Sequence, residues 1–179
     1  EIAEAFVKAK SEGNGPKRSI IFLLVAGEEK GLLGSAYFTD KNPIVPLESI
    51  VCNLNIDMIG RKDKNHKTDE YVYLIGADKL SNDLDKISKS VNKKYLNFEL
   101  DYTYNNKKDP NRFYYRSDHY NFAKNGIPVI FFFTGVHEDY HKPGDDIEKI
   151  LFPKYSKITQ LVFHTAWEVT NRQKRLKLN

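Results

Sequence analysis

The chain has 179 residues, a length that suits a single domain spanning 1–179 rather than two separate cores. Hydrophobic residues make up 40% and charged residues 29%, a composition that excludes a disordered chain. The net charge of +4 is small and scattered, so we expect no nucleic-acid partner. The longest uninterrupted apolar run, 20–26, is too short to cross a bilayer, so no membrane span is expected.

A single cysteine, Cys52, excludes an internal disulfide and a zinc cluster made of thiolates. It lies in an apolar stretch and is expected to be a small buried side chain. The sequence opens at Glu1 already in a helical pattern, which predicts that the natural chain begins further upstream.

The first half of the chain alternates helical and strand patterns. Helical spacing of apolar residues predicts a helix over 2–12. Residues 19–26 (SIIFLLVA) are apolar almost throughout, which predicts a central strand covered on both faces. A short helix over 32–39 and a second buried strand over 51–58 follow.

The second half continues the alternation. The patterns predict strands over 71–75 and 128–133 and helices over 83–96, 117–124 and 153–172, with Ser117 as the N-cap of the middle helix. Residues 61–70 are all polar, which predicts a surface loop with a solvated His66. Strands that alternate with helices are typical of an α/β layered sheet.

Acidic and imidazole side chains gather where the predicted strands end. Glu28 and Glu29 follow the first strand, Asp57 lies at the end of the second, and the run 137–141 (HEDYH) follows the last. In open α/β sheets, sites form just beyond the carboxyl ends of strands. Carboxylate and imidazole are natural zinc ligands, so the pattern indicates a metal site at this edge.

The two adjacent glutamates suit a division of roles. If Glu29 binds a metal, Glu28 can face the water that the metal acidifies and act as its general base. The alternative is a pair of solvated glutamates that open a turn. Asp57 lies in an apolar strand where an unpaired carboxylate is costly, so it needs a metal, a cation or several hydrogen-bond donors.

The run 137–141 also matches the H-E-x-x-H pattern of helical zinc peptidases. That pattern requires a helix, which places both imidazoles on one face. Gly135 lies just before the run and Pro143-Gly144 just after it, leaving no room for a helix. His141 is therefore the favoured ligand and His137 a loop residue, with the helical reading kept as an alternative.

Two further groups precede the last predicted strand. Asp118 either caps the helix that begins beside it, where negative charge is favoured, or lines a pocket. Arg116 ends the aromatic and basic segment 112–116, which either lines a specificity pocket or packs against neighbouring loops.

Taken together, these segments resemble the M28 family of zinc exopeptidases, which includes aminopeptidases and glutamate carboxypeptidases. The matching segments are AGEEKGLLGS (26–35), NLNIDMIG (53–60), RSDHYNF (116–122), GIPVIFFF (126–133) and DYHKPGDD (139–146). The resemblance implies a three-layer α/β sandwich with a mixed, mostly parallel central sheet flanked by helices. It also implies two zinc ions that share a bridging aspartate.

Carried over to this sequence, the resemblance makes Glu28 the general base and Glu29 a zinc ligand. Asp57 binds the other zinc, and His141 joins Glu29 on the first. Tyr140 is similar to a tyrosine that helps polarise the substrate carbonyl in some members of the family.

The family's remaining ligands, a histidine and the bridging aspartate, lie upstream of the first residue here. We therefore expect a chain that lacks the N-terminal part of the domain, binds zinc poorly and is nearly inactive. Missing strands would also leave an exposed sheet edge, which favours self-association.

For the intact domain the resemblance implies removal of N-terminal residues from peptide substrates. Two alternatives stay open: a glutaminyl-cyclase-like enzyme on the same fold, and a non-catalytic binding module that has kept the peptidase fold. Peptidases of this kind are often exported, to the periplasm or the cell exterior, and a single cysteine is compatible with export.

Overall fold

A computed structural model describes residues 1–179. In chain order the helices and strands are α1 (Ile2–Ser11), α2 (Leu33–Ala36), β1 (Asn53–Ile56), β2 (Tyr71–Ile75), α3 (Asn82–Tyr95), β3 (Glu99–Asp101), α4 (His119–Ala123), β4 (Val129–Phe133) and α5 (Phe152–Asn171). Among the shorter helical turns, η1 (Glu28–Lys30) carries the two adjacent glutamates.

The four strands form one mixed sheet in the order β1-β4-β2-β3. β1 runs parallel to β4 and β2 runs parallel to β3, whereas β2 and β4 are antiparallel. The carboxyl ends of β1 and β4 therefore lie at the same edge as the beginnings of β2 and β3. This edge carries the polar side chains described below.

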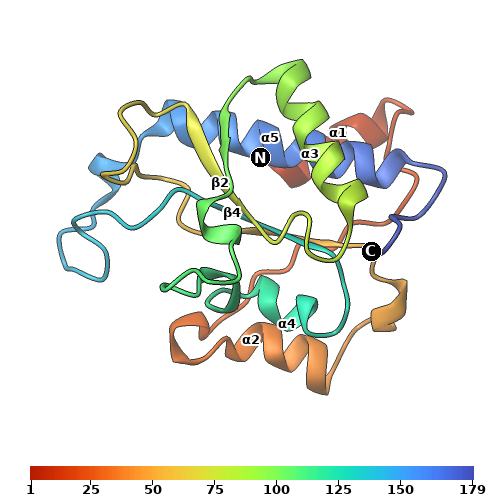
Figure 1. Cartoon of the computed structure of the whole chain (residues 1–179). Helices are drawn as coiled ribbons and strands as arrows, with labels where there is room; N and C mark the ends of the chain where they lie inside the picture. Colours follow the sequence, from red (N-terminus) through yellow and green to blue (C-terminus); the bar gives the residue numbers. More distant parts are fainter.

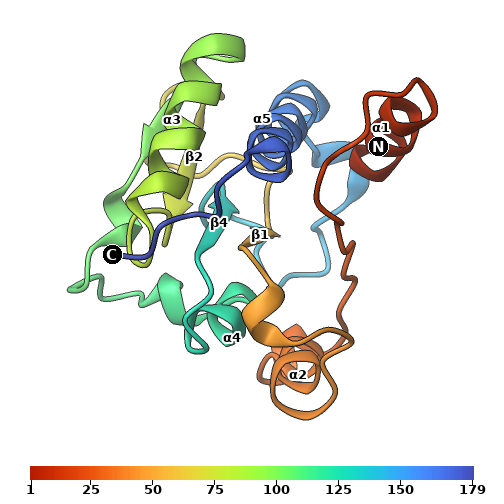
Figure 2. The same cartoon turned by 90° about the vertical axis from the view of Figure 1, so that its right-hand side faces the viewer.

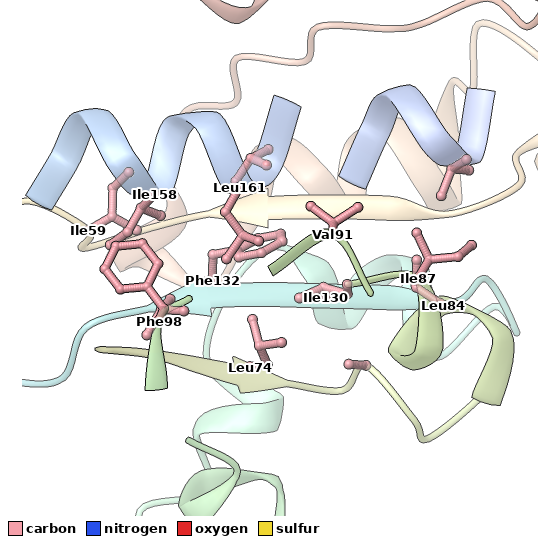
Figure 3. Close-up of a cluster of buried hydrophobic side chains, with 14 of the residues drawn as sticks. Ile59, Leu74, Leu84, Ile87, Val91, Phe98, Ile130, Phe132, Ile158 and Leu161 are labelled. Atoms are coloured by element: carbon pink, nitrogen blue, oxygen red, sulfur yellow. The ribbon is translucent and has the colours of Figure 1, made fainter. Parts of the chain in front are cut away.

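Helices cover both faces of the sheet, which gives three layers (Figure 1). On one face, α3 and α5 pack on side chains of β2 and β4, because alternate residues of each strand point to that side. Figure 3 shows this core, a single cluster that includes Leu74 and Phe132 from the strands, Ile87 from α3 and Leu161 from α5. The predicted α/β sandwich with a mixed sheet is confirmed.

The opposite face is covered by α2, α4 and aromatic side chains. Phe131 and Phe133 point to this side and pack with Tyr73 and Phe113. Burial on both faces explains why the sequence 129–133 is apolar at every position rather than alternating.

The strand predicted over 19–26 is wrong. These residues form an extended connection that joins α1 to α2 and passes beside the sheet (Figure 2). No backbone hydrogen bond joins 19–25 to another segment, and Leu24 is 92% exposed. A strand is stabilised by a paired neighbour and by covering layers, and in this structure the segment has neither.

The other predicted elements are present with small changes in their bounds. The helix predicted over 32–39 is α2 followed by a wider turn, η2 (Tyr37–Lys41), and the strand over 51–58 shortens to β1. The three-residue strand β3 was not predicted. None of the helices combines the length and the hydropathy needed to cross a membrane.

Candidate metal and catalytic site

The residues that follow β1 and β4 are hydrogen-bonded to each other. Thr134 donates its backbone N–H and its hydroxyl to the Met58 carbonyl, at 3.2 and 2.7 Å. Met58 has a φ of 53°, so the chain turns sharply immediately after Asp57. Asp57 is thereby fixed beside the segment that leads from β4 to His141.

Five side chains gather at this edge, and we call Glu28, Glu29, Asp57, Asp118 and His141 the strand-end cluster. His141 Nε2 lies 2.8 Å from Glu29 Oε1, and both side chains are more than half exposed. The structure therefore brings together Glu29 and His141, which are 112 positions apart in the sequence.

The carboxylates of the strand-end cluster repel one another. Burial first, and then the charges of Asp57, Glu29 and Asp118, together raise the pKa of Glu28 to about 7, against a lowering by His141. Burial also raises the pKa of Asp57, with added repulsion from Asp118 and Glu29. Accumulated negative charge with little compensation favours a cation at this position.

Asp57 and Asp118 each have one hydroxyl partner. Ser117 donates its hydroxyl to Asp57 Oδ2 at 2.7 Å, and its own oxygen accepts from the Asn55 amide at 2.9 Å. Asp118 accepts from the hydroxyl of Ser35. The predicted N-cap at Ser117 is wrong, because α4 begins one residue later and this hydroxyl faces Asp57 instead.

Asp118 is the N-cap residue of α4, yet its side chain makes no capping hydrogen bond. Its negative charge acts on Glu28 and Asp57, so Asp118 lies among the charged side chains of the strand-end cluster. The pocket-lining role stays a prediction.

Tyr140 and Arg116 lie beside the strand-end cluster. The Tyr140 ring stacks on the His141 ring with centroids 3.8 Å apart. Burial raises the pKa of Tyr140, while the positive charge of Arg116 lowers it and the charges of Glu29 and Glu28 raise it. Phe113 of segment 112–116 packs against Tyr104 and Phe133, with ring centroids 4.7 and 4.9 Å apart, which supports the packing alternative for this segment. The specificity-pocket alternative stays a prediction.

Residues 137–141 form a turn and not a helix. His141 has a φ of 56°, a left-handed conformation that a helix excludes. His137 Nε2 lies 3.6 Å from Asp145 instead, and burial lowers the pKa of His137. The two imidazoles therefore do not share the helical face that the H-E-x-x-H pattern requires.

Sequence reasoning missed the ion pairs that hold this turn. Arg61 donates to Asp139 and to Asp145, each at 2.7 Å, and Lys149 lies 2.9 Å from Asp139. Arg61 follows β1 by a few residues, so it ties the segment that carries Asp57 to the turn that carries His141. No local signal marks a pair separated by 78 positions.

A second polar group was also missed. The predicted surface loop 61–70 folds onto the sheet, and Asp63 within it is only 4% exposed. His66, predicted to be solvated, stacks on Tyr71 with ring centroids 3.4 Å apart. We call Asp63, His66, Tyr73 and Asp101 the loop cluster. Tyr71 and Tyr73 could have indicated this cluster, because two hydroxyls on one face of a buried strand need polar partners nearby.

The strand-end cluster fits a divalent cation by its chemistry. It offers carboxylate oxygens and one imidazole nitrogen, the donors that zinc takes. Glu29 and His141 contact each other directly, so a shared cation would replace that contact. Asp57 lies apart from this pair, since the three do not form a single compact ligand group.

The fold and the site together define a three-layer α/β protein with a candidate cation-binding cluster at the end of a mixed sheet. The sequence model of Peptidase family M28 matches residues 1–166. The chain belongs to this family.

Several known proteins are similar to parts of the chain. Aminopeptidase YwaD of Bacillus subtilis (strain 168) is 28% identical over 166 residues, which are 89% of this chain and 34% of that protein. The structure of BSAP, a zinc aminopeptidase from Bacillus subtilis, is 26% identical, with a TM-score of 0.62, and covers 82% of this chain and 35% of its own.

The structure of LapB from Legionella pneumophila has a TM-score of 0.71 at 21% identity, over 92% of this chain and 43% of its own. At this identity the likeness concerns the fold alone. The chain spans about a third of the length of the curated relative that it matches.

Proposed function

We propose that this chain carries part of the active site of a metal-dependent peptide hydrolase, a zinc aminopeptidase that releases N-terminal residues. One observation carries the proposal: a base, an imidazole and further carboxylates from four separate segments converge at the carboxyl ends of β1 and β4. Membership of Peptidase family M28 and the likeness to a zinc aminopeptidase support it.

Two cations are proposed for the intact domain. Glu29 and His141 would hold one of them, because their donor atoms already meet at 2.8 Å. Asp57 would hold the other, since it lies near Glu29 without belonging to the same compact group. Both ions need further ligands, because a catalytic zinc normally has three protein ligands and one open position.

Bound zinc supplies Lewis acidity, which polarises the scissile carbonyl and makes a water a better nucleophile at neutral pH. The chain moves the proton. The Glu28 carboxylate accepts it from the attacking water as the carbon–oxygen bond forms, and returns it to the amine nitrogen as the carbon–nitrogen bond breaks. The Tyr140 hydroxyl donates a hydrogen bond to the carbonyl oxygen while negative charge develops there.

Asp118 and Arg116 are proposed to contact the peptide substrate. Asp118 adds negative charge beside Glu28, which suits the positive N-terminal amine of a peptide. Arg116 is exposed and close to Tyr140, so it can reach a carbonyl or carboxylate of the same substrate.

Hydrolysis of amino-acid 4-nitroanilides by the polypeptide at its natural length, with zinc and with a chelator, tests the proposal. Glu28→Gln should lower kcat by about 10²–10⁴-fold, while circular dichroism and zinc affinity stay unchanged. Glu138→Gln is the matched control, because Glu138 is an exposed glutamate beside the same turn and should keep full activity. Activity that survives both the chelator and Glu28→Gln would overturn the proposal.

A peptide with N-terminal glutamine separates the remaining alternatives. Release of free glutamine supports the aminopeptidase, whereas a cyclised peptide and ammonia would show the glutaminyl-cyclase reaction instead. Zinc binding with neither product would point to a binding module.

Self-association is a further proposal. β1 is an outermost strand of the sheet, with one side unpaired, and the extended segment 19–26 exposes Ile21, Phe22 and Leu24. Open edges and exposed apolar side chains favour pairing with another chain. Sedimentation velocity should show oligomers that Leu24→Lys reduces; a monomer at all concentrations would contradict the proposal.

A further inference from the structure

The loop cluster lies over the strands β2 and β3, at the same end of the sheet as the strand-end cluster but on other strands. Tyr71 pairs with Glu99 and Tyr73 with Asp101 in the parallel register of these strands. Because side chains alternate along a strand, Glu99 and Asp101 share one face. His66 lies against that face, and one ligand atom from each of His66, Glu99 and Asp101 lies within 4.8 Å of the other two.

The imidazole of His66 is held in one orientation. Its ring stacks on Tyr71 with an angle of 5° between the planes and meets Tyr73 edge-on at 74°. Its side chain is only 9% exposed. Nδ1 lies 3.0 Å from Asp63 Oδ1, and Nε2 lies 3.1 Å from Asp101 Oδ2. Both ring nitrogens therefore face carboxylates.

Asp63 determines which nitrogen carries the proton. Its side chain is 2% exposed and accepts from the backbone and side-chain amides of Asn65, each at 3.1 Å, and from the Tyr73 hydroxyl at 2.6 Å. These donors keep Asp63 a carboxylate, which can only accept, so Nδ1 donates to it.

With Nδ1 protonated, a neutral ring presents the lone pair of Nε2 to the carboxylate of Asp101. Two acceptors 3.1 Å apart require a positive species between them or beside them. That species is either a second proton on the ring or a metal ion.

The surroundings favour the metal ion. Histidine that binds a metal commonly donates its other N–H to a carboxylate, and Asp63 has that position toward His66. A hollow of about 540 Å³ opens between residues 65–68 and β3 and is lined by all three ligand candidates, which leaves space for an ion and its waters. The exposed Glu99 completes a set of one nitrogen and two carboxylates.

We propose that His66, Asp101 and Glu99 bind a divalent transition-metal ion such as zinc, with Asp63 as the residue that orients His66. Three protein ligands with water in the open position match a four-coordinate site at roughly 2.0–2.2 Å ligand distances. This site is additional to the strand-end cluster. The strands β1 and β3 are three positions apart in the sheet, roughly 14 Å at the usual strand spacing.

The test titrates zinc into the whole chain by calorimetry in a Glu29→Gln/His141→Gln background, which disables the strand-end cluster. One equivalent should still bind, and Asp101→Asn should weaken that binding at least tenfold. Asn keeps the shape of the side chain and can still accept from the Thr103 N–H. Glu99→Gln, at an exposed position, gives a second variant with little risk to folding.

Asp69→Asn is the matched control, because Asp69 is a half-exposed carboxylate of the same loop outside the ligand set. The ¹⁵N chemical shift of His66 Nε2 gives an independent readout and should change on zinc addition. No zinc binding in this background, or binding that Asp101→Asn and Glu99→Gln leave unchanged, would overturn the proposal. Two protons on His66 at all zinc concentrations would show that the cluster is an ion pair only.

Discussion

The strand-end cluster and the loop cluster lie at the same edge of the sheet, but the pKa of a buried aspartate is raised in the first and lowered in the second. Asp57 has one side-chain donor, Ser117, so burial and repulsion by Asp118 and Glu29 raise its pKa. Asp63 is also buried, which alone would raise its pKa, but hydrogen bonds from Tyr73 and His66 outweigh burial and lower it. The hydrogen-bond donors around Asp63, most of which have no counterpart at Asp57, account for the lowered pKa of Asp63.

The difference separates two uses of a carboxylate. A group whose charge is already satisfied stabilises the fold, as Asp63 does by holding the loop 61–70 on β2. A group whose charge is left uncompensated costs stability and is available to a cation or a substrate. Changes that remove charge should therefore have opposite effects on stability in the two clusters.

The largest effect is expected for Asp63→Ala. The substitution leaves the Tyr73 hydroxyl, the Asn65 amides and His66 Nδ1 without their acceptor, at a cost of about 3 kcal/mol in the free energy of unfolding. Urea denaturation measures this change. Asp69→Ala, on the same loop but half exposed, should stay within about 0.5 kcal/mol. Equal costs for the two variants would show that Asp63 is not the anchor of the loop.

The second prediction is for His119, which is fully buried and whose ring nitrogens make no well-formed hydrogen bond. Burial lowers its pKa to about 3, against a smaller raising effect of the Tyr114 backbone. Between pH 6.5 and pH 3 the unfolded chain binds a proton that the folded chain does not, so stability falls as pH falls through this range.

The loss from His119 approaches about 1.4 kcal/mol per pH unit, or about 2 kcal/mol between pH 7 and pH 5. His119→Phe keeps an aromatic ring against Phe131 and should remove this part of the acid sensitivity. Denaturation curves at pH 5 and pH 7 measure it. An unchanged pH dependence in the variant would contradict the assignment.

Gly135→Ala tests the packing of Asp63 against the segment that follows β4. Gly135 has a φ of 89°, and an added Cβ would lie 2.5–2.8 Å from the Asp63 side chain. We expect a loss of about 2 kcal/mol, from backbone strain and from displacement of Asp63. Gly126→Ala is the control, because Gly126 also has a positive φ but no atom within 4 Å of the added Cβ. Gly126→Ala should lose less stability than Gly135→Ala, because it measures the backbone strain alone. Equal losses of stability in the two variants would contradict a role for the contact with Asp63.

The smallest effect, with the opposite sign, is expected for Asp57→Asn in the metal-free protein. The raised pKa of Asp57 means that its charged form costs stability, and asparagine keeps an oxygen that accepts from Ser117. At pH 7 in a chelator the variant should be more stable by about 0.5 kcal/mol. A clear loss of stability would show that Asp57 has a structural role.

Much of the fold followed from sequence patterns because periodicity reports which faces are buried. α3 and α5 carry apolar residues at helical spacing, and β4 is apolar on both faces because both are covered. The segment 19–26 has the same apolar character but no paired strand in this structure. Composition records the tendency to be buried, not the presence of a neighbour.

The site could be predicted in part for a similar reason. Glu28, Asp57 and His141 follow strands or expected strands, so their meeting could be inferred from sheet geometry. The ion pair of Arg61 with Asp139 and the contact of His66 with Asp101 could not. They depend on how two loops fold back on the sheet, and polar loops have no periodicity that fixes their path.

The central claim is that Glu29 and His141 bind zinc, and calorimetric zinc titration at pH 7 of the polypeptide at its natural length tests it most directly. Every variant carries Asp101→Asn, so that only zinc binding to the strand-end cluster is measured. The matched pair is His141→Gln and His137→Gln, two imidazoles from the same turn. We predict that His141→Gln weakens zinc binding at least tenfold, because His141 faces Glu29, while His137→Gln leaves it unchanged, because His137 faces Asp145. Zinc binding that depends on both histidines equally would contradict the account and restore the H-E-x-x-H interpretation.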